Sequence, residues 1–200
     1  HVLVRDVAYD SLSKRDRATL HVDVAGWAEA SLEERIDEFA ELIASHLAAA
    51  LAYEEELAGS SPELSLRGLR DLVCRAAIRA ARRASSVSAI PAAQRWQTLA
   101  IEQARRMDAP PRERMALAAD YYDYVWHESA PAERVAVFSE AVALFPAIAD
   151  PTDADRQLRA RLQGALAEAT YESNRVEAAQ AILRDAIADL EDEPPSRGRA

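Results

Sequence analysis

The sequence has little of what the alternatives to an all-helical fold require. One cysteine, Cys74, excludes an internal disulfide and indicates a reducing compartment. There are five glycines and no Asn-Gly or Asp-Gly dipeptide, so the usual turn of a β-hairpin is missing. No apolar run is long enough to cross a bilayer, and no signal peptide is visible. We therefore expect a cytoplasmic protein without membrane contact.

Motifs that carry enzyme chemistry are also missing from the sequence. It has no Gly-rich phosphate loop, no G-x-S-x-G turn and no closely spaced His or Cys pair for a metal. Cys74 has no histidine near it in sequence, which favours a core residue over a nucleophile. His21 and His46 are expected to be packed or hydrogen-bonded helix residues. We predict no catalytic residue, no metal site and no cofactor in this segment.

The charge balance is acidic and narrows the choice of partner. Asp and Glu total 34 against 24 Lys and Arg, which gives a formal net charge of −10. Such a field repels the phosphate backbone of nucleic acids unless a basic patch overrides it. We expect no direct nucleic-acid binding, and a protein or peptide partner instead.

What the sequence has in abundance is helix-forming residues. Half of the residues are apolar, and alanine, the best helix former, fills about a fifth of all positions. Apolar residues recur at helical spacing nearly throughout, which predicts an all-α protein. The expected helices span about 2–12, 13 onward, 36–56, 65–85, 91 onward, 111–128, 131 onward, 153–172 and 174 onward.

Capping residues and apolar stripes support these helices. Ser13, Thr152 and Asn174 are the expected N-caps, and Pro91 and Pro131 suit a first helical turn. One expected apolar stripe consists of Leu20, Val24 and Trp27. The stripe expected to be buried in the 65–85 helix consists of Leu66, Leu69, Val73, Ala76, Ala80 and Ala84.

An internal repeat appears in the second half of the chain. An alanine followed by an aliphatic residue recurs at Ala100-Ile101, Ala141-Val142 and Ala186-Ile187, at spacings of 41 and 45 residues. One helix pair per repeat predicts antiparallel helix pairs stacked as a tetratricopeptide-like α-solenoid, with a period above the roughly 34 residues of the standard repeat. The break at Gly59–Pro62 predicts three parts: 1–58, the repeats at 63–190, and a tail or linker at 191–200.

Two clusters are candidates for partner binding. Arg75, Arg79 and Arg82 fall on one helical stripe, with Arg83 adjacent. They form either a docking site for an acidic partner or phosphate, or a solvated face paired with neighbouring carboxylates.

The second candidate is aromatic. Tyr121, Tyr124 and Trp126 lie in one short stretch together with Tyr122. They either fill the space between repeats or line a groove for a peptide, because Tyr and Trp are favoured interface anchors.

The N-terminal residues resemble a known family. His1–Leu12, Lys14–Arg17, Leu20-His21 and Ala25, followed by Glu41–Ala50, are similar to a stretch of bacterial signalling ATPases of the STAND class, which include cyclase-linked and large LuxR-type regulators. Leu47 stands where that family usually has an aromatic residue.

The resemblance implies that this segment starts at the end of a winged-helix domain and continues into a tetratricopeptide-like array. It makes His1 a candidate contact to the nucleotide phosphate in a full-length parent. The resulting hypothesis is a non-catalytic interaction or sensor module of a larger ATP-dependent signalling or transcriptional regulator. The alternative is a structural scaffold that mediates self-association.

Overall fold

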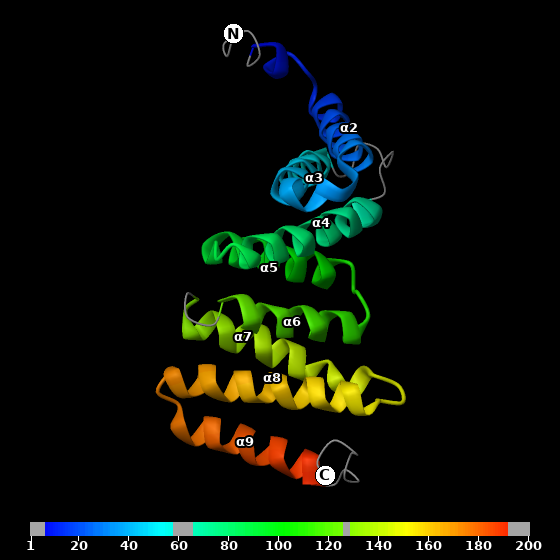
Figure 1. Cartoon of the computed structure of the whole chain (residues 1–200). Coiled ribbons are helices and arrows are strands. Elements are labelled where there is room, and N and C mark those ends of the chain that lie inside the picture. Colours follow the sequence, from blue (N-terminus) through cyan, green and yellow to red (C-terminus); the bar gives the residue numbers. More distant parts are fainter. Residues whose placement is uncertain (1–6, 58–65, 126–128, 192–200) are drawn as a thin grey trace. The chain divides into compact units, whose positions relative to one another are not determined.

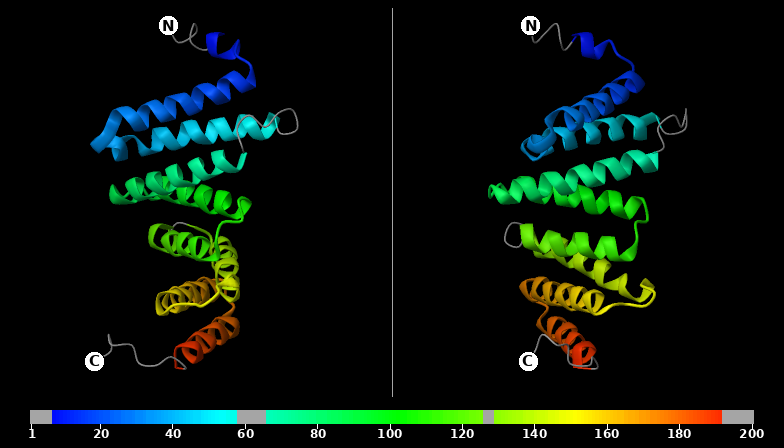
Figure 2. Two further views of the ribbon diagram at one scale, coloured as in Figure 1. Left: turned by 90° about the vertical axis from the view of Figure 1, so that its right-hand side faces the viewer. Right: turned by 45° about the vertical axis from the view of Figure 1, so that its right-hand side comes forward.

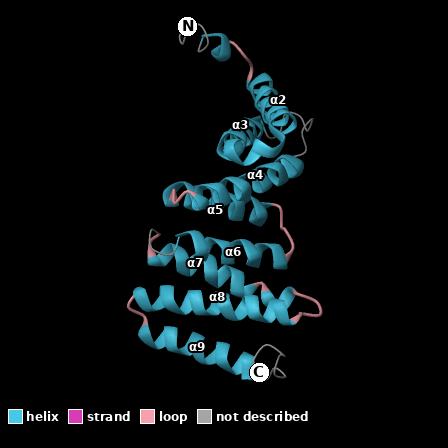
Figure 3. Cartoon of the chain, in the orientation of Figure 1, coloured by secondary structure: helices cyan, strands magenta, loops and turns pink. Residues whose placement is uncertain are grey.

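The computed structural model describes residues 7–57, 66–125 and 129–191, and in these ranges the chain is helical and contains no strand (Figures 1 and 3). Most helices pack mainly against their neighbours in sequence, as in an all-α helical repeat fold. The predicted fold class is thereby confirmed. The chain forms two compact units, residues 1–108 and 109–200.

The described part of the first unit contains four long helices. They are α2 (Lys14–Leu32), α3 (Ala40–Leu57), α4 (Leu66–Ser86) and α5 (Ile90–Arg106), with the 3₁₀ helix η1 (Glu33–Phe39) joining α2 to α3. Residues 7–10 are also helical. The α2–α3 and α4–α5 pairs each lie side by side, and α3 packs on α4 (Figure 2).

The described part of the second unit also contains four helices. They are α6 (Pro111–Val125), α7 (Pro131–Ala143), α8 (Asp153–Glu172) and α9 (Val176–Glu191), with the short 3₁₀ helix η2 (Phe145–Ala147) before α8. Helix α8 is central in this unit because α6, α7 and α9 all pack against it.

Most predicted helix starts agree with the structure. The Ser13 side chain accepts a hydrogen bond from the Asp16 N–H at 3.1 Å. Thr152 and Asp155 form a reciprocal capping box at the start of α8. Asn174 differs from the prediction: its φ is 58°, and its N–H donates to the Tyr171 carbonyl at 2.9 Å, so it closes the end of α8. Asparagine tolerates this left-handed conformation better than most residues do.

Alanine supplies more of the buried core than any other residue type. The equivalent alanines of the predicted repeat, Ala100, Ala141 and Ala186, are all buried. Their small side chains let neighbouring helices approach closely. The expected stripe of α4 is also buried, except for Leu66, which is half-buried.

Helix α2 is packed differently from the expectation raised by its large apolar residues. Its buried positions are Ala18, Ala25 and Ala28, whereas Leu20 is 45% and Trp27 67% exposed. The helix approaches α3 through its small side chains, since these allow the closest contact between backbones.

The predicted three-part division of the chain stays a prediction. Residues 59–62, the expected boundary, lie outside the described residues, as does the expected tail from residue 192 onward. The helices on either side of that boundary, α3 and α4, pack together within the first unit.

Candidate functional site: an arginine-lined groove

The opposite faces of α4 have opposite chemistry. One face buries Leu69, Val73, Ala77 and Ala80 among the neighbouring helices. The other carries Arg75, Arg79, Arg82 and Arg83, of which three are exposed and Arg79 is half-exposed. Because α4 lies between α3 and α5, its apolar face is fixed by packing. The arginines are therefore held on the outer face of the unit.

A groove runs along this basic face. Its volume is about 650 Å³, within the range of ordinary ligand pockets. The lining residues come from the second half of α4 and from η1: Asp37, Arg75, Ile78, Arg79, Arg82, Arg83 and Ser86. The structure thus brings together the predicted Arg75, Arg79 and Arg82. It adds Asp37 and Ile78, which the sequence did not single out.

Two of these arginines have acidic neighbours within the unit. Arg75 pairs with Asp71 one turn earlier on α4. Arg79 lies 3.7 Å from a Glu29 carboxylate oxygen and 3.8 Å from one of Asp37. Both Arg79 distances exceed hydrogen-bond length, so these contacts are electrostatic and loose.

The other two arginines have no such pair. Neither Arg82 nor Arg83 has a carboxylate of a described side chain within 4.0 Å. The positive charge of Arg83 still acts on a carboxylate of η1. The pKa of Glu38 is lowered, first by the hydrogen bond from Arg35 and to a smaller extent by the positive charge of Arg83. The groove therefore keeps positive charge that its surroundings leave unneutralised.

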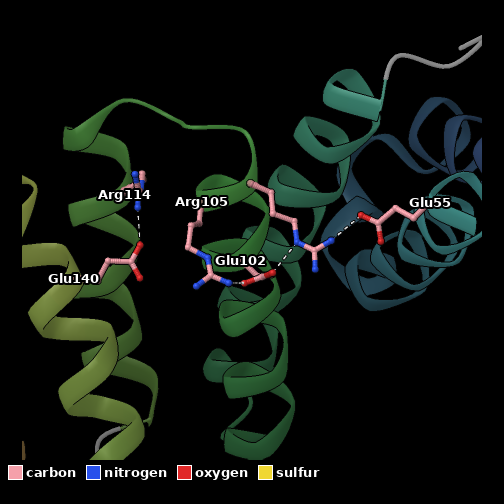
Figure 4. Close-up of polar contacts among 6 residues, drawn as sticks. Glu55, Glu102, Arg105, Arg114 and Glu140 are labelled. Carbon is pink, nitrogen blue, oxygen red and sulfur yellow. Dashed lines mark hydrogen bonds and ion pairs between the residues drawn. The ribbon is translucent and has the colours of Figure 1, made fainter. Parts of the chain in front are cut away.

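Several arginines elsewhere in the first unit are engaged at short range. Arg106 bridges Glu102, at 2.6 Å, and Glu55, at 2.8 Å, and thereby ties α5 to α3 (Figure 4). Arg105 also pairs with Glu102, and Arg70 of α4 reaches the same Glu55 at 2.8 Å. Arg67, at the start of α4, has no described carboxylate partner either, but it does not line the groove as Arg82 and Arg83 do.

In the second unit, a cluster of polar contacts surrounds Asp155. Its carboxylate accepts hydrogen bonds from Arg112 Nε at 2.9 Å and Nη2 at 3.1 Å, and from the Thr152 N–H at 2.7 Å. The Arg112 and Thr152 contacts hold the pKa of Asp155 well below its usual range. Arg114 pairs separately with Glu140 at 2.5 Å, joining α6 to α7 (Figure 4).

Of the two interpretations of the aromatic cluster, the position of Tyr121 fits the filling of space between helices and not a groove. The Tyr121 side chain is fully buried. Its ring packs edge-on against the ring of the buried Phe138, with 6.1 Å between the two ring centroids. Tyr121 thus fills space between helices and is not available to a partner. Tyr124 is half-buried, and Trp126 lies outside the described residues, so their predicted role in binding stays a prediction.

A cluster of rings in the first unit was missed by the sequence analysis. The Nδ1 atoms of His21 and His46 are 2.7 Å apart, and the Tyr9 hydroxyl is 2.8 Å from His21 Nε2. The hydroxyl oxygens of Tyr53 and Tyr9 are 3.2 Å apart, and the Arg17 guanidinium is 4.8 Å from the centre of the Tyr9 ring. Desolvation, and to a lesser extent His46, lower the pKa of His21.

A sequence signal for this cluster did exist. Arg17 and His21 are four residues apart, and His46 and Tyr53 are seven apart, so each pair shares a helix face. The expectation that both histidines are hydrogen-bonded helix residues agrees with the structure.

The remaining reactive residues have plain structural settings. Cys74 is buried, and its thiol donates to the Ala100 carbonyl at 3.5 Å, as expected of a small core residue. Within the described ranges, no three His, Cys, Asp or Glu side chains gather in a way that could hold a metal ion. No helix of the described chain has the length and apolar character of a membrane span. His1 lies outside the described residues, and its predicted role stays a prediction.

Comparison with known proteins gives no further guide: the chain matches no protein-family model, no curated protein and no solved structure.

Proposed function

We propose that this chain is a non-catalytic protein-interaction module that docks a partner protein in the arginine-lined groove of α4. The observation that carries the proposal is the pair Arg82 and Arg83, which face a groove without a carboxylate partner among the described side chains. In a chain with a net charge of −10, carboxylates are abundant, and Arg70, Arg75 and Arg106 of α4 and α5 pair with them.

The chemistry of arginine suits such a surface. A guanidinium presents five N–H donors in a planar fork that matches carboxylate or phosphate oxygens in pairs, and it keeps its charge at any physiological pH. Arginine is also enriched among the residues that dominate binding energy at protein interfaces. A rigid helix presents the arginines of the groove, which lowers the entropy lost when a partner binds.

We place this module in a larger ATP-dependent regulator of signalling or transcription. The support for this part is the resemblance of the first 50 or so residues to STAND-class ATPases. ATP binding shifts the equilibrium between two conformational states of such a regulator. A partner bound by the repeats would shift the same equilibrium, because a ligand that prefers one state raises the population of that state. The test is the ATPase or output activity of the full-length protein with and without residues 60–200. Unchanged activity would contradict the regulatory role.

Docking in the groove can be tested separately in the cell. A photo-cross-linking amino acid is placed at position 82, and in a control at Thr98, an exposed residue of α5 outside the groove. We expect a discrete cross-linked partner from position 82 that is missing from position 98 and disappears with Arg83→Glu. Identical products from both positions would contradict docking in this groove.

A second candidate function is self-association. The observation that favours it is the exposed apolar side of α9, where Val176, Leu183 and Ile187 are 40%, 46% and 55% exposed. Sedimentation velocity at several protein concentrations separates the two functions. A species that stays monomeric at high concentration contradicts self-association, whereas a dimer that is lost with Leu183→Glu supports it.

A further inference from the structure

We propose that the ligand of the groove is an acidic peptide segment with carboxylates about one helical turn apart, and that Asp37 competes with this ligand for Arg79. This inference rests on the proposed function and names the chemistry of its partner. It is carried by the spacing of the arginines, the charge left over in the groove, and the loose contact between Asp37 and Arg79.

The spacing of the arginines favours an extended ligand. Arg75 and Arg82 are seven residues apart on α4, which corresponds to about 10 Å along the helix axis at 1.5 Å per residue. A single phosphate group is too small to contact both ends of this row. A peptide with acidic side chains at successive turns presents its carboxylates about 5–6 Å apart, which matches the rise of one helical turn.

The charge balance sets the number of acidic groups. Four arginines and one aspartate line the groove. Asp71 pairs with Arg75, while Glu29 and Asp37 share Arg79. Arg82 and Arg83 are the two lining arginines without a described carboxylate partner, so a ligand that pairs with both carries at least two carboxylates.

One apolar residue adds a second requirement. Ile78 lies among the arginines in the lining of the groove and is half-buried. An aliphatic side chain on the peptide would cover its remaining exposed surface, and such burial is favourable at about 25 cal/mol per Å². The expected ligand is therefore acidic and carries an aliphatic residue between its carboxylates.

Asp37 already occupies the place of a ligand carboxylate. It reaches Arg79 from η1, and its side chain is 73% exposed. Its oxygen lies 3.8 Å from Arg79 Nε, outside hydrogen-bond range, so a peptide carboxylate at about 2.8 Å would form the stronger contact. Binding would displace Asp37, and the negative charge of Asp37 would oppose the approach of an acidic peptide.

An unbiased selection tests the chemistry of the ligand. Random twelve-residue peptides displayed on phage are selected on the whole chain and counter-selected on the Arg82→Glu/Arg83→Glu variant. We expect enrichment of Asp and Glu three or four positions apart with an aliphatic residue between them. Selected peptides without acidic enrichment, or a selection that yields no peptide dependent on residues 82 and 83, would overturn the proposal.

Charge variants test the arginines and their competitor with the best selected peptide, made synthetically. Arg82→Glu/Arg83→Glu should weaken binding at least about tenfold, whereas Arg67→Glu, at the exposed start of the same helix, should leave it unchanged. Asp37→Asn should tighten binding about two- to fivefold, and Asp23→Asn, an exposed control on α2, should do so by less. Weaker or unchanged binding by Asp37→Asn would refute the competition.

The final experiment distinguishes a carboxylate ligand from a phosphorylated one. It also distinguishes failure of the proposed ligand from failure of the proposed function. The affinity of a peptide with phosphoserine in place of one glutamate should be within about tenfold of that of its parent. An affinity increased by more than this would show that the ligand is a phosphorylated segment and not a carboxylate one. If no acidic peptide binds but position 82 still cross-links a partner, the ligand class is wrong and docking stands. If both fail, the proposed function fails as well.

Discussion

Two sites in this chain, one in each unit, use arginine in opposite ways. In the second unit, Arg112 delivers two hydrogen bonds to Asp155, whose side chain is 9% exposed. In the first unit, Arg82 and Arg83 line an open groove without a described carboxylate in reach. The helical spacing of charged residues looks similar in the two places. What differs is whether a second helix brings an acceptor to the guanidinium.

The largest expected effect comes from removing the acceptor in the second unit. Asp155→Ala removes the capping box of α8 and both Arg112 hydrogen bonds. Loss of a cap costs about 1 kcal/mol and loss of charge-assisted hydrogen bonds about 1.5–3 kcal/mol, so we expect a loss of about 2–4 kcal/mol in the free energy of unfolding. Urea unfolding followed by circular dichroism measures it.

The control for this prediction lies two residues away. Asp153→Ala removes an exposed pair with Arg156 at 3.1 Å from the same helical turn. It should cost no more than about 1 kcal/mol, because exposed ion pairs contribute little. Equal losses from both variants would show that α8 depends on negative charge at its start and not on the Asp155 contacts.

A second comparison concerns side-chain size in the first unit. Ala80 is fully buried on α4, so Ala80→Leu must force α4 away from its neighbours, at a cost of about 1–3 kcal/mol. Trp27 is 67% exposed, so Trp27→Ala should change the stability by about 0.5 kcal/mol or less. Thermal unfolding of the two variants checks this, and a larger loss from Trp27→Ala would contradict the packing of α2.

These residues show why the fold was more predictable from the sequence than the site. Helices follow from spacing and caps, which are local, so the bounds of α8 and the caps Ser13 and Thr152 could be predicted. Which face of α2 is buried depends on how closely α3 approaches, and alanine has no large side chain to indicate this. The apolar size of Trp27 therefore gave no sign of its exposure.

The candidate site was predictable only in part for the same reason. The arginine stripe of α4 is local and was visible in the sequence. Asp37 reaches it from a 3₁₀ helix more than forty positions away, and the His21–His46 pair joins two helices. Contacts of this kind depend on the packing of helices, which spacing within one helix does not determine.

Acid should affect the two units at different pH values. The pKa of His21 is lowered in the folded state, so below about 6.5, its unfolded reference value, the unfolded chain binds the proton more readily and the first unit loses stability. The pKa of Asp155 is also lowered, but its reference value is 3.8. The stability that Asp155 contributes is present above that pH and is lost only as the pH falls further.

Hydrogen exchange measured helix by helix at decreasing pH can follow both changes. We expect α2 and α3 to lose protection first, as the pH falls below about 6.5, with α8 still protected. His21→Gln, which keeps a hydrogen-bonding group but cannot titrate, should remove the early loss. If this variant loses protection over the same pH range as the unchanged chain, His21 is not the group responsible.

The smallest expected effect on stability is that of the groove itself. Arg82→Glu/Arg83→Glu removes no ion pair with a described side chain, so the free energy of unfolding should change by about 0.5 kcal/mol or less. Arg112→Glu, the matched change in the second unit, should cost more than about 2 kcal/mol, because it leaves the nearly buried Asp155 facing a like charge. Urea unfolding of the two variants compares them directly. If the double variant at 82 and 83 were as unstable as Arg112→Glu, these arginines would stabilise the fold. Their exposure would then be no evidence that the groove binds a partner.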